Sequence, residues 1–568
     1  MRRFPTSFFI THEIVYKTQH SLTVYKLMGT NFVEDASLHI NEHVQENRTK
    51  LISPRRNIKL IWLLVVLLIA SFLRFSYLNQ VSYWFDESVS LKVVEFPLVE
   101  MMSRLIYGDD HPPLFFLILK VWVLVFDHPL VMPRMLSVFC SLATIVGSYC
   151  FIKEAYQFHT ENQKHCRAEF AAILATIFLA LSPLQISWAQ QVRMYALLPN
   201  LAIWSSYFLF RAMFRIESSK RDWILFTLFS VAQFYTHYFG LFIAMAQYLF
   251  ALSYALIQRF QNKSLRREFL IQPVLFSGIA SYFCFLPWLL VFLDHRQKVT
   301  EKFHAPDLTW STAGTRLGIA YDLQWGWSIT PETGLFVGQF FFIIFLLLAI
   351  HRRPADYFLI MVSAFPFLAA AITSVFMRNI FVGRYLIAAQ MFSFLSIAVV
   401  ISDIPWRLFR WSSAVILVLS MSLLAKEQFL TRQFNASLPG MQSAVSYLDQ
   451  QRHPDDIVMI CNPMLFTSIV LYTNNRDGLF VPGAPGRYPF FQGAGVMRDD
   501  EFQLLYKMNQ PNQKRVWTFD ADKWLGGTWS VPMSEKWHEV SRKRFKEFNA
   551  EFIVRCYERN LPEENTAK

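Results

Sequence analysis

The sequence lacks any regular spacing of cysteine. Its six cysteines form no CxxC pair and no cysteine–histidine pattern, and they therefore predict no metal site. Cys461 and Cys556 stand in a polar C-terminal tail. Two small buried residues in strands are the favoured interpretation, and a disulfide is the alternative if the tail is extracytoplasmic.

A cleavable signal peptide is also missing. Residues 1–50 are polar, mixed in charge and weakly patterned, and we expect residues 1–57 to form a disordered cytoplasmic segment. Met28 is an alternative start of the protein, because the segment before it contributes no recognisable element.

Polar side chains are scarce in several long stretches of the chain. Hydrophobic residues make up 54% of the 568 residues, and the mean hydropathy is +0.27. One soluble core cannot hide that much apolar surface. The run Ile58–Leu78 has the length, about 20 residues, that crosses the hydrocarbon layer of a bilayer. The composition excludes an ordinary soluble protein and predicts an α-helical polytopic membrane protein.

The apolar runs predict about eleven transmembrane helices. Their approximate spans are 58–78, 133–151, 168–187, 196–214, 222–237, 239–257, 269–293, 335–350, 356–376, 384–402 and 411–425. A further run, Pro112–Phe126, is shorter and carries Lys120 near its middle. That length favours a helix lying at the membrane surface.

The net charge of +12 indicates how these helices are oriented. Most lysines and arginines flank apolar runs, which favours membrane orientation over nucleic-acid binding. If Pro112–Phe126 does not cross the membrane, the large basic clusters all fall on one side, which the positive-inside rule assigns to the cytoplasm. If it crosses, the later clusters change sides. We therefore predict a transmembrane domain over 58–425 and an extracytoplasmic domain over 426–568.

The segment 426–568 is polar and rich in turn residues. Short β-rich runs alternate there with helix-like stretches, which predicts a small α/β domain. The expected strands are Asp456–Cys461, Arg515–Phe519 and Phe552–Tyr557, and the expected helices are Met441–Gln450 and Asp499–Met508.

Two adjacent carboxylates, Asp86 and Glu87, stand near the start of the first predicted outer loop. Acids at a membrane surface are costly unless they are used or solvated. Either one can take the proton of an attacking hydroxyl as a general base. The structural alternatives are a solvated pair or acids that stabilise a helix N-terminus.

Asp109, Asp110 and His111 follow later in the same loop, directly before Pro112 and Pro113. The acids and the prolines suit the first turn of a helix, with Asp109 or Asp110 as its cap. The functional alternative is a carboxylate or an imidazole aimed at a metal or at a hydroxyl group.

Two arginines break the positive-inside pattern. Arg193, followed by Tyr195, and Arg384, followed by Tyr385, stand at the predicted outer ends of apolar helices. A planar guanidinium there suits a phosphate, because its fork binds two oxygens; snorkelling is the alternative. His237, at another outer junction, is either a neutral hydrogen-bond donor or a satisfied interfacial histidine.

The order of five short motifs resembles the membrane-embedded GT-C glycosyltransferases, in the bacterial branch related to protein O-mannosyltransferases and aminoarabinose transferases. The motifs are WFDE at 84–87, DHPPL at 110–114, SPLQISWAQQVRMYAL at 182–197, THYFGLF at 236–242 and GRYL at 383–386. Each motif alone is weak, but all five occur in order and on the same predicted side. The resemblance covers about residues 58–400.

The resemblance implies an inverting transfer of a sugar from a polyprenyl-phosphate carrier to an extracytoplasmic acceptor. It implies that the first outer loop carries the catalytic acid, which maps to Asp86 with Glu87 beside it. By analogy, Arg193 and Arg384 hold the carrier phosphate, which eases its departure as the leaving group. Tyr195 and Tyr385 are expected near the same pocket.

The sequence departs from the family at one point that bears on metals. Gln190 and Gln191 stand in the second outer loop, where no clear Asp-X-Asp pair is present. A divalent metal therefore remains an open expectation, and no other cofactor is implied.

A transporter or flippase of a lipid-linked sugar is the alternative function. Transporters place ionisable groups near the membrane midplane and often contain inverted repeats, whereas here these groups stand at helix ends and no repeat is visible. A membrane-anchored binding protein is a third interpretation. The expected partners are a polyprenyl-phosphate sugar, membrane lipids and an unknown acceptor, without nucleic acid, at the plasma or inner membrane.

Overall fold

The structure is a computed structural model. It describes residues 54–126, 130–157, 167–215, 219–261, 270–302, 308–321, 330–377, 379–489, 492–505, 513–524, 526–548 and 550–560. The expected N-terminal segment up to residue 53, Met28 included, lies outside the described residues. By their contacts the residues fall into two units, Met1–Val65 and Val66–Lys568. Helix α3 (Pro54–Phe75) runs across that boundary, and all the candidate site residues belong to the second unit.

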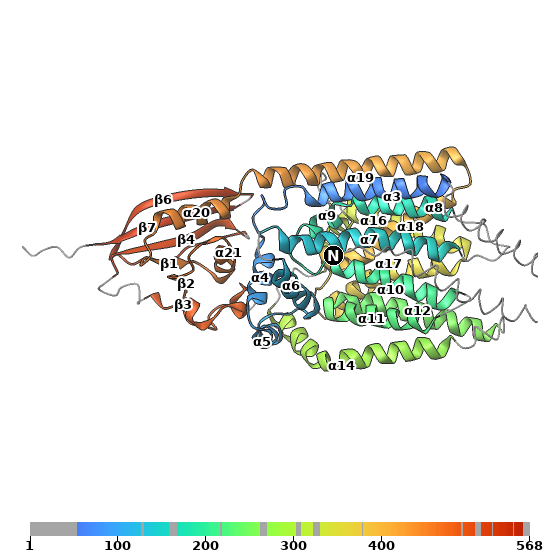
Figure 1. Ribbon diagram of the computed structural model, residues 1–568, viewed down its shortest axis with the longest axis horizontal. Coiled ribbons are helices and arrows are strands. Elements are labelled where there is room, and N and C mark those ends of the chain that lie inside the picture. Colours follow the sequence, from blue (N-terminus) through green and yellow to red (C-terminus); the bar gives the residue numbers. More distant parts are fainter. Residues whose placement is uncertain are drawn as a thin grey trace, which may run out of the picture. The chain divides into compact units, whose positions relative to one another are not determined.

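Each predicted transmembrane run forms a helix. After α3 these are α7 (Met132–Gln157), α8 (Ala168–Leu181) with α9 (Pro183–Ala189), α10 (Leu197–Phe214), α11 (Lys220–Thr236), α12 (Phe239–Phe260), α14 (Ile271–Lys302), α16 (Pro331–His351), α17 (Pro354–Phe376), α18 (Ile387–Asp403) and α19 (Arg407–Ala436). The helix α15 (Trp310–Ala320) and the 3-10 helix η1 (Gly383–Leu386) lie between them in sequence. Figure 1 shows the long helices of the second unit gathered into one bundle.

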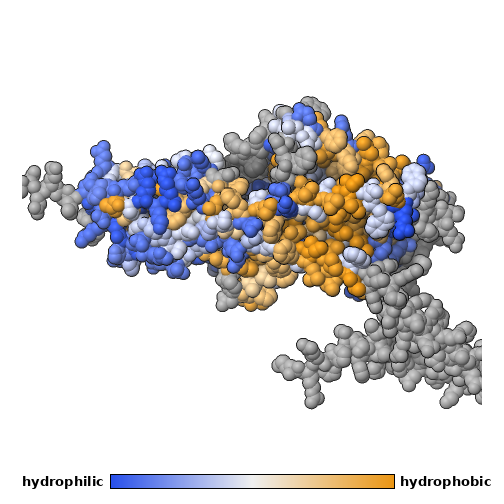
Figure 2. Space-filling view, turned by 90° about the horizontal axis from the view of Figure 1, so that it is seen from above, coloured by the Kyte–Doolittle hydropathy of each residue, from blue (hydrophilic) through white to orange (hydrophobic). Residues whose placement is uncertain are grey.

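Hydropathy and length make the chain a multi-pass membrane protein. Within the described residues, seven helices are long and apolar enough to cross a membrane, and the number is eight if α8 and α9, bent by 60° at their junction, form one span. Large apolar side chains are exposed on the outside of the bundle, including Phe276 and Phe376. Figure 2 shows this apolar surface over the helices, while the residues of the C-terminal strands are mainly hydrophilic. The predicted fold class is confirmed.

Three short helices follow α3, and these helices and the turn between the second and third carry the first group of candidate residues. They are α4 (Phe85–Glu95), α5 (Leu98–Gly108) and α6 (Leu114–Val125). The apolar run at Pro112–Phe126 thus forms a helix of 12 residues, about 18 Å long. That is too short to cross the roughly 30 Å of hydrocarbon in a bilayer.

The C-terminal segment folds into a mixed sheet with helices α20 (Gly440–Gln451) and α21 (Pro463–Tyr472). The strands are β1 (Ile457–Ile460), β2 (Leu479–Pro482), β3 (Phe502–Gln503), β4 (Arg515–Trp524), β5 (Gly527–Trp529), β6 (Trp537–Glu547) and β7 (Ala550–Arg559). Their order is β3-β2-β1-β4-β7-β6, with β5 paired to β4. The pairs β3–β2, β2–β1 and β1–β4 are parallel, and the others are antiparallel.

Two expectations for this segment have different outcomes. The helix expected over Asp499–Met508 is wrong for its described part, which is a 3-10 turn at Asp499–Glu501 followed by strand β3. Glu501 accepts a hydrogen bond from the backbone of Arg498 and limits the turn, and pairing of β3 with β2 then outweighs the local helix propensity. Cys461 and Cys556 are free and buried, as the favoured interpretation expected, but only Cys556 lies in a strand, β7, whereas Cys461 directly follows β1.

Candidate functional site

Glu87 is the most constrained of the candidate acids. It lies in the first turn of α4, is 1% exposed, and forms a two-point ion pair with Arg134 of α7, with both N–O distances at 2.8 Å. Its carboxylate also accepts hydrogen bonds from the backbone N–H groups of Trp84, at 2.9 Å, and Val192, at 3.0 Å. Glu87 therefore connects α4, α7 and the segment that carries Arg193.

Arg134 extends this connection to the chain between α3 and α4. Its guanidinium donates to the backbone carbonyls of Leu78, Val81 and Ser82 and lies 4.5 Å from the ring centroid of Tyr83. A buried ion pair is stable only when its remaining donors and acceptors are satisfied, and these carbonyls and N–H groups provide that. The ion pair of Glu87 and Arg134 therefore fixes α4 relative to α7 and to the chain between α3 and α4.

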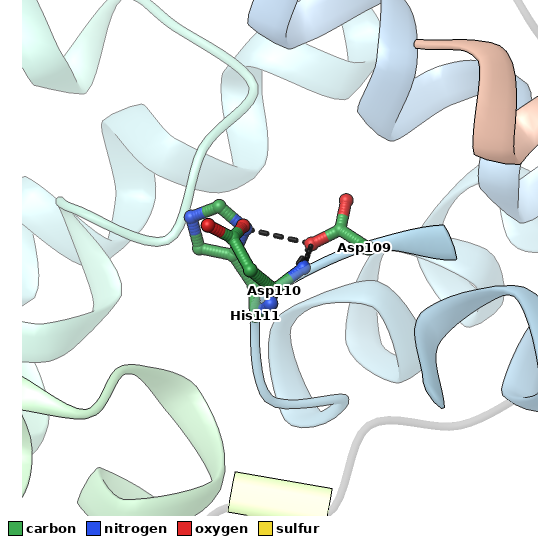
Figure 3. A group of neighbouring side chains, drawn as sticks. All are labelled: Asp109, Asp110 and His111. Carbon is green, nitrogen blue, oxygen red and sulfur yellow. Dashed lines mark hydrogen bonds and ion pairs between the residues drawn. The ribbon is translucent and has the colours of Figure 1, made fainter. Parts of the chain in front are cut away.

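The acids and the imidazole between α5 and α6 form a compact cluster (Figure 3). Oδ1 of Asp109 accepts from the backbone N–H groups of Asp110, at 2.7 Å, and His111, at 2.9 Å. Nδ1 of His111 lies 2.7 Å from a carboxylate oxygen of each aspartate. Asp109 is the C-cap residue of α5 and also orients the imidazole. The expectation that Asp109 or Asp110 caps the next helix is wrong, because the N-cap of α6 is Pro113 and no side chain caps that helix.

The cluster alters the protonation of its members. Burial lowers the pKa of His111, but the carboxylates of Asp110 and Asp109 outweigh burial and raise that pKa to about 9. Burial raises the pKa of Asp109 and of Asp110, and the charge of His111 outweighs it and lowers both pKa values. A proton on Nδ1 of His111 therefore links the two carboxylates.

Arg193 joins the cluster to α4. Its Nη2 lies 3.1 Å from Nε2 of His111, and its Nη1 donates to the hydroxyl of Ser90 at 3.2 Å. A guanidinium can only donate, so the contact with Nε2 is a hydrogen bond only while the imidazole is neutral. Once His111 is protonated, two donors face one another, and an acceptor such as an oxyanion is needed between them.

Arg384 reaches the same place from η1. Its guanidinium carbon lies 5.9 Å from the ring centroids of Trp188 and Tyr195 and 5.4 Å from that of Tyr385. The Nε atoms of Arg384 and Arg193 are both buried, and neither has a hydrogen-bond partner among the described residues. Buried N–H groups that lack partners are uncommon because they are costly, and an anion would satisfy both Nε atoms.

Aromatic rings complete the wall around the arginines. The rings of Tyr195 and Tyr385 are stacked at 6.1 Å, and His237 lies 5.6 Å and 5.0 Å from them. The backbone N–H of Phe239 donates to Nδ1 of His237. Burial, reinforced by the charge of His111, lowers the pKa of His237 well below its ordinary value, so its ring is neutral with a proton on Nε2.

Asp86 differs from its neighbour Glu87 in having an uncommitted carboxylate. The side chain is half-buried, and no hydrogen bond to its carboxylate occurs within the described residues. Its charge acts on Arg193, Arg384 and Tyr195, which places it electrostatically among them. The structure thus brings the ten predicted site residues into one neighbourhood, from segments scattered between residues 86 and 385.

The C-terminal domain supports the helices that carry the acids. Ser468 of α21 donates to Ser88 of α4 at 3.1 Å, and Lys92 of α4 pairs with Glu501 at 2.6 Å. Gly108, at the end of α5, packs so closely on Gly495 that a Cβ on Gly108 would lie 2.6 Å from the carbonyl oxygen. A cavity of about 350 Å³, lined in part by Arg104 and Tyr107, lies at this junction.

The cluster of Asp109, Asp110 and His111 also has the composition of a metal site. Two carboxylate oxygens and one imidazole nitrogen lie within 4.8 Å of one another. Such a donor set suits a divalent cation, which would take the place of the proton on Nδ1. Because a divalent cation carries one more charge than the proton it replaces, the cluster would then be more positive by one charge beside Arg193.

No known family profile and no curated protein matches the sequence. Two solved structures of ArnT, the aminoarabinose transferase of Cupriavidus metallidurans, are similar in fold. The apo structure has a TM-score of 0.56 at 10% identity and matches 89% of this chain and 98% of that one. The structure bound to undecaprenyl phosphate has a TM-score of 0.55 at 13% identity and matches 87% and 98%. The chain has the GT-C fold.

Within this GT-C fold, several site residues were not among the sequence-based candidates. Arg134 is the main one, and the signal for it was present. It stands at the start of the predicted helix 133–151, on the same predicted side as Arg193 and Arg384, and so also breaks the positive-inside pattern. Ser90 and Trp188 carried no such signal, because their roles depend on contacts between distant segments.

Proposed function

We propose that this chain is a membrane glycosyltransferase that moves a sugar from a polyprenyl-phosphate carrier to an extracytoplasmic acceptor, at the plasma or inner membrane. One observation carries the proposal. Two arginines, Arg193 and Arg384, have buried Nε atoms without partners and stand beside Asp86, whose carboxylate accepts no hydrogen bond within the described residues. That is the arrangement that a phosphorylated donor and a hydroxyl nucleophile require.

In the proposed reaction, Asp86 acts as the general base. It takes the proton of the acceptor hydroxyl while the acceptor oxygen bonds to the anomeric carbon of the sugar. The bond between that carbon and the phosphate oxygen breaks, and its electron pair leaves with the polyprenyl phosphate. A single displacement of this kind inverts the anomeric configuration.

Arg193 and Arg384 hold the carrier phosphate in this proposal, and Tyr195 and Tyr385 line its pocket. Protonated His111 provides a further donor to the same anion, while Asp109 and Asp110 keep it charged. Glu87 positions the site through Arg134 and Val192 and does not take the proton. The fold of a protein that binds undecaprenyl phosphate supports this class of donor.

The test separates binding from chemistry. Purified protein is assayed for binding of radiolabelled polyprenyl-phosphate sugars and for product formation with a panel of acceptors. Asp86→Asn should bind donor as the wild type does and lose roughly 10²–10⁴ in rate. Arg193→Ala and Arg384→Ala should weaken donor binding, and lysine should rescue only in part, because it lacks the fork.

Arg221→Ala is the matched control, because Arg221 is exposed in the first turn of α11. It should bind and transfer like the wild type. Transfer by Asp86→Asn at the wild-type rate would exclude Asp86 as the base. A wild type that forms no product with any donor but moves the lipid-linked sugar across a membrane would favour the transporter.

A further inference from the structure

Arg432, near the end of α19, has no partner for its charge. Its Nε and Nη2 atoms are buried, and no hydrogen bond to the guanidinium occurs within the described residues. The charges that act on it belong to Arg134 and Glu87. Glu87 is already bound at two points by Arg134, so two cations share one carboxylate. A buried cation is stable when it is paired, and an anion beside Arg432 would therefore stabilise it.

Asn435, three residues further along α19, has an acceptor atom without a donor. Its Oδ1 is buried and accepts no hydrogen bond within the described residues. Residues three apart lie on one face of a helix. An acceptor and a set of donors are thus unsatisfied next to each other, and a ligand that carries both an oxyanion and an O–H or N–H group would satisfy both.

An apolar groove lies on the same side of α19. Its volume is about 560 Å³, and its walls include Leu68, Ile69 and Phe72 of α3 and Ser422, Ala425 and Phe429 of α19. The rings of Phe72 and Phe429 are stacked across it at 5.8 Å. Apart from Ser422 and Lys426 its lining is apolar and comes from membrane-facing helices, so the groove suits a hydrocarbon chain rather than a polar ligand.

The groove and the arginine follow one another along α19. Arg432 is three residues after Phe429 and seven after Ala425, the spacing that keeps side chains on one face, and one turn advances the helix by about 5.4 Å. We propose that this stripe binds an anionic phospholipid, with one chain in the groove, the phosphate on Arg432 and a headgroup hydroxyl on Asn435.

This site is separate from the proposed donor site, which uses Arg193 and Arg384 and no residue of α19. It acts on that site nonetheless. The lipid phosphate neutralises the surplus charge beside Glu87, and Glu87 holds the backbone of Val192 next to Arg193. A bound lipid therefore stabilises the segment on which Arg193 is placed.

The experiment compares lipids with the same chains and different headgroups. Delipidated full-length protein is titrated with palmitoyl-oleoyl phosphatidylglycerol or phosphatidylcholine, and binding is followed by native mass spectrometry and by thermal unfolding. Phosphatidylglycerol should bind and raise the unfolding temperature more than phosphatidylcholine. Arg432→Gln should weaken phosphatidylglycerol about ten-fold or more and remove the difference between the two lipids.

Two further variants distinguish the parts of the site. Ser422→Phe fills the groove and should weaken the lipid while Arg432 is intact, which also serves if Arg432→Gln fails to fold. Arg407→Gln changes an exposed arginine at the other end of α19 and should bind like the wild type. Equal stabilisation by inorganic phosphate, or unchanged phosphatidylglycerol binding by Arg432→Gln or by Ser422→Phe, would overturn the proposal.

Discussion

Asp86 and Glu87 are adjacent in sequence and have opposite environments. The carboxylate of Glu87 accepts four hydrogen bonds, and two of them come from the side chain of Arg134. Asp86, one residue earlier on α4, points elsewhere and accepts none within the described residues. Sequence could identify the pair as candidates but could not divide their roles, because Arg134 is brought in by tertiary contact.

This difference predicts distinct effects of substitution. Arg134→Met leaves the buried carboxylate of Glu87 without the arginine that binds it at two points and should cost about 3–5 kcal/mol of stability. Glu87→Leu combined with Arg134→Met should recover part of that loss, because the buried carboxylate is removed together with the arginine that binds it. Thermal unfolding measures both. Glu87→Gln should impair transfer less than Asp86→Asn, and the reverse order would exchange the roles proposed for the two acids.

His111 predicts a pH dependence of stability. Its pKa is near 6.5 when unfolded and is raised to about 9 in the fold by Asp110 and Asp109 against the effect of burial. Its contribution, on the order of 3 kcal/mol, is fully present below pH 6.5 and lost as pH rises through 9. The unfolding temperature of the wild type should fall over this window more than that of His111→Gln.

The exposed histidine His453 provides the control for that measurement. His453→Gln should follow the wild-type curve. If His111→Gln also follows it, the imidazole does not hold its proton between the two carboxylates.

At the scale of elements, hydropathy predicted the long helices and little of what connects them. The apolar sequence runs that predicted α7, α12 and α17 are uninterrupted, and these helices occur where they were expected. The break between α8 and α9 was not predicted. Its local signal was present, because Ser182 caps α9 and Pro183, which cannot donate to the preceding turn, is its first residue. What the sequence could not show is that Arg74 donates to the carbonyls of Leu179 and Ala180 at the end of α8, a contact between segments over a hundred residues apart.

The junction between α5 and the C-terminal domain predicts a sensitive glycine. A Cβ on Gly108 would lie 2.6 Å from the carbonyl oxygen of Gly495, and backbone there cannot move aside cheaply. Gly108→Ala should cost roughly 1–3 kcal/mol and loosen the contact that supports Asp109. Unfolding and limited proteolysis of the C-terminal domain test this.

Gly278→Ala is the matched control, because a Cβ on this glycine of α14 meets only Tyr248, at an ordinary contact distance of 3.7 Å. It should leave both measurements unchanged. An equal response to the two substitutions would mean that the close approach at Gly108 is not what makes that position sensitive.

At the scale of the whole molecule, the site is assembled from both halves of the sequence. Its charged groups come from α4, the α5–α6 turn, the segment after α9 and η1, while α21 and Glu501 brace α4 from the C-terminal domain. Motifs located the first group, because each carries unusual polar residues next to apolar runs. The contacts of α4 with the C-terminal domain could not be predicted. Ser88, Ser468 and Lys92 are common residue types, and they meet only because the tertiary fold brings the C-terminal domain against α4.

The orientation of the molecule in the membrane is the last prediction, and it follows from charge. The basic clusters at 153–167, 211–221, 259–267 and 407–410 lie between helices at one end of the predicted spans, which the positive-inside rule assigns to the cytoplasm. The site and the C-terminal domain then face the outside.

Single cysteines at exposed positions test this orientation in a cysteine-free background. Asp477→Cys in the C-terminal domain and Thr309→Cys before α15 should react with an impermeant maleimide in intact cells, while Gln261→Cys after α12 should react only after permeabilisation. All three positions are exposed, so a difference in labelling reports the side of the membrane rather than burial. Labelling of Gln261→Cys in intact cells, with Asp477→Cys protected, would invert the topology and place the proposed transfer on the cytoplasmic face.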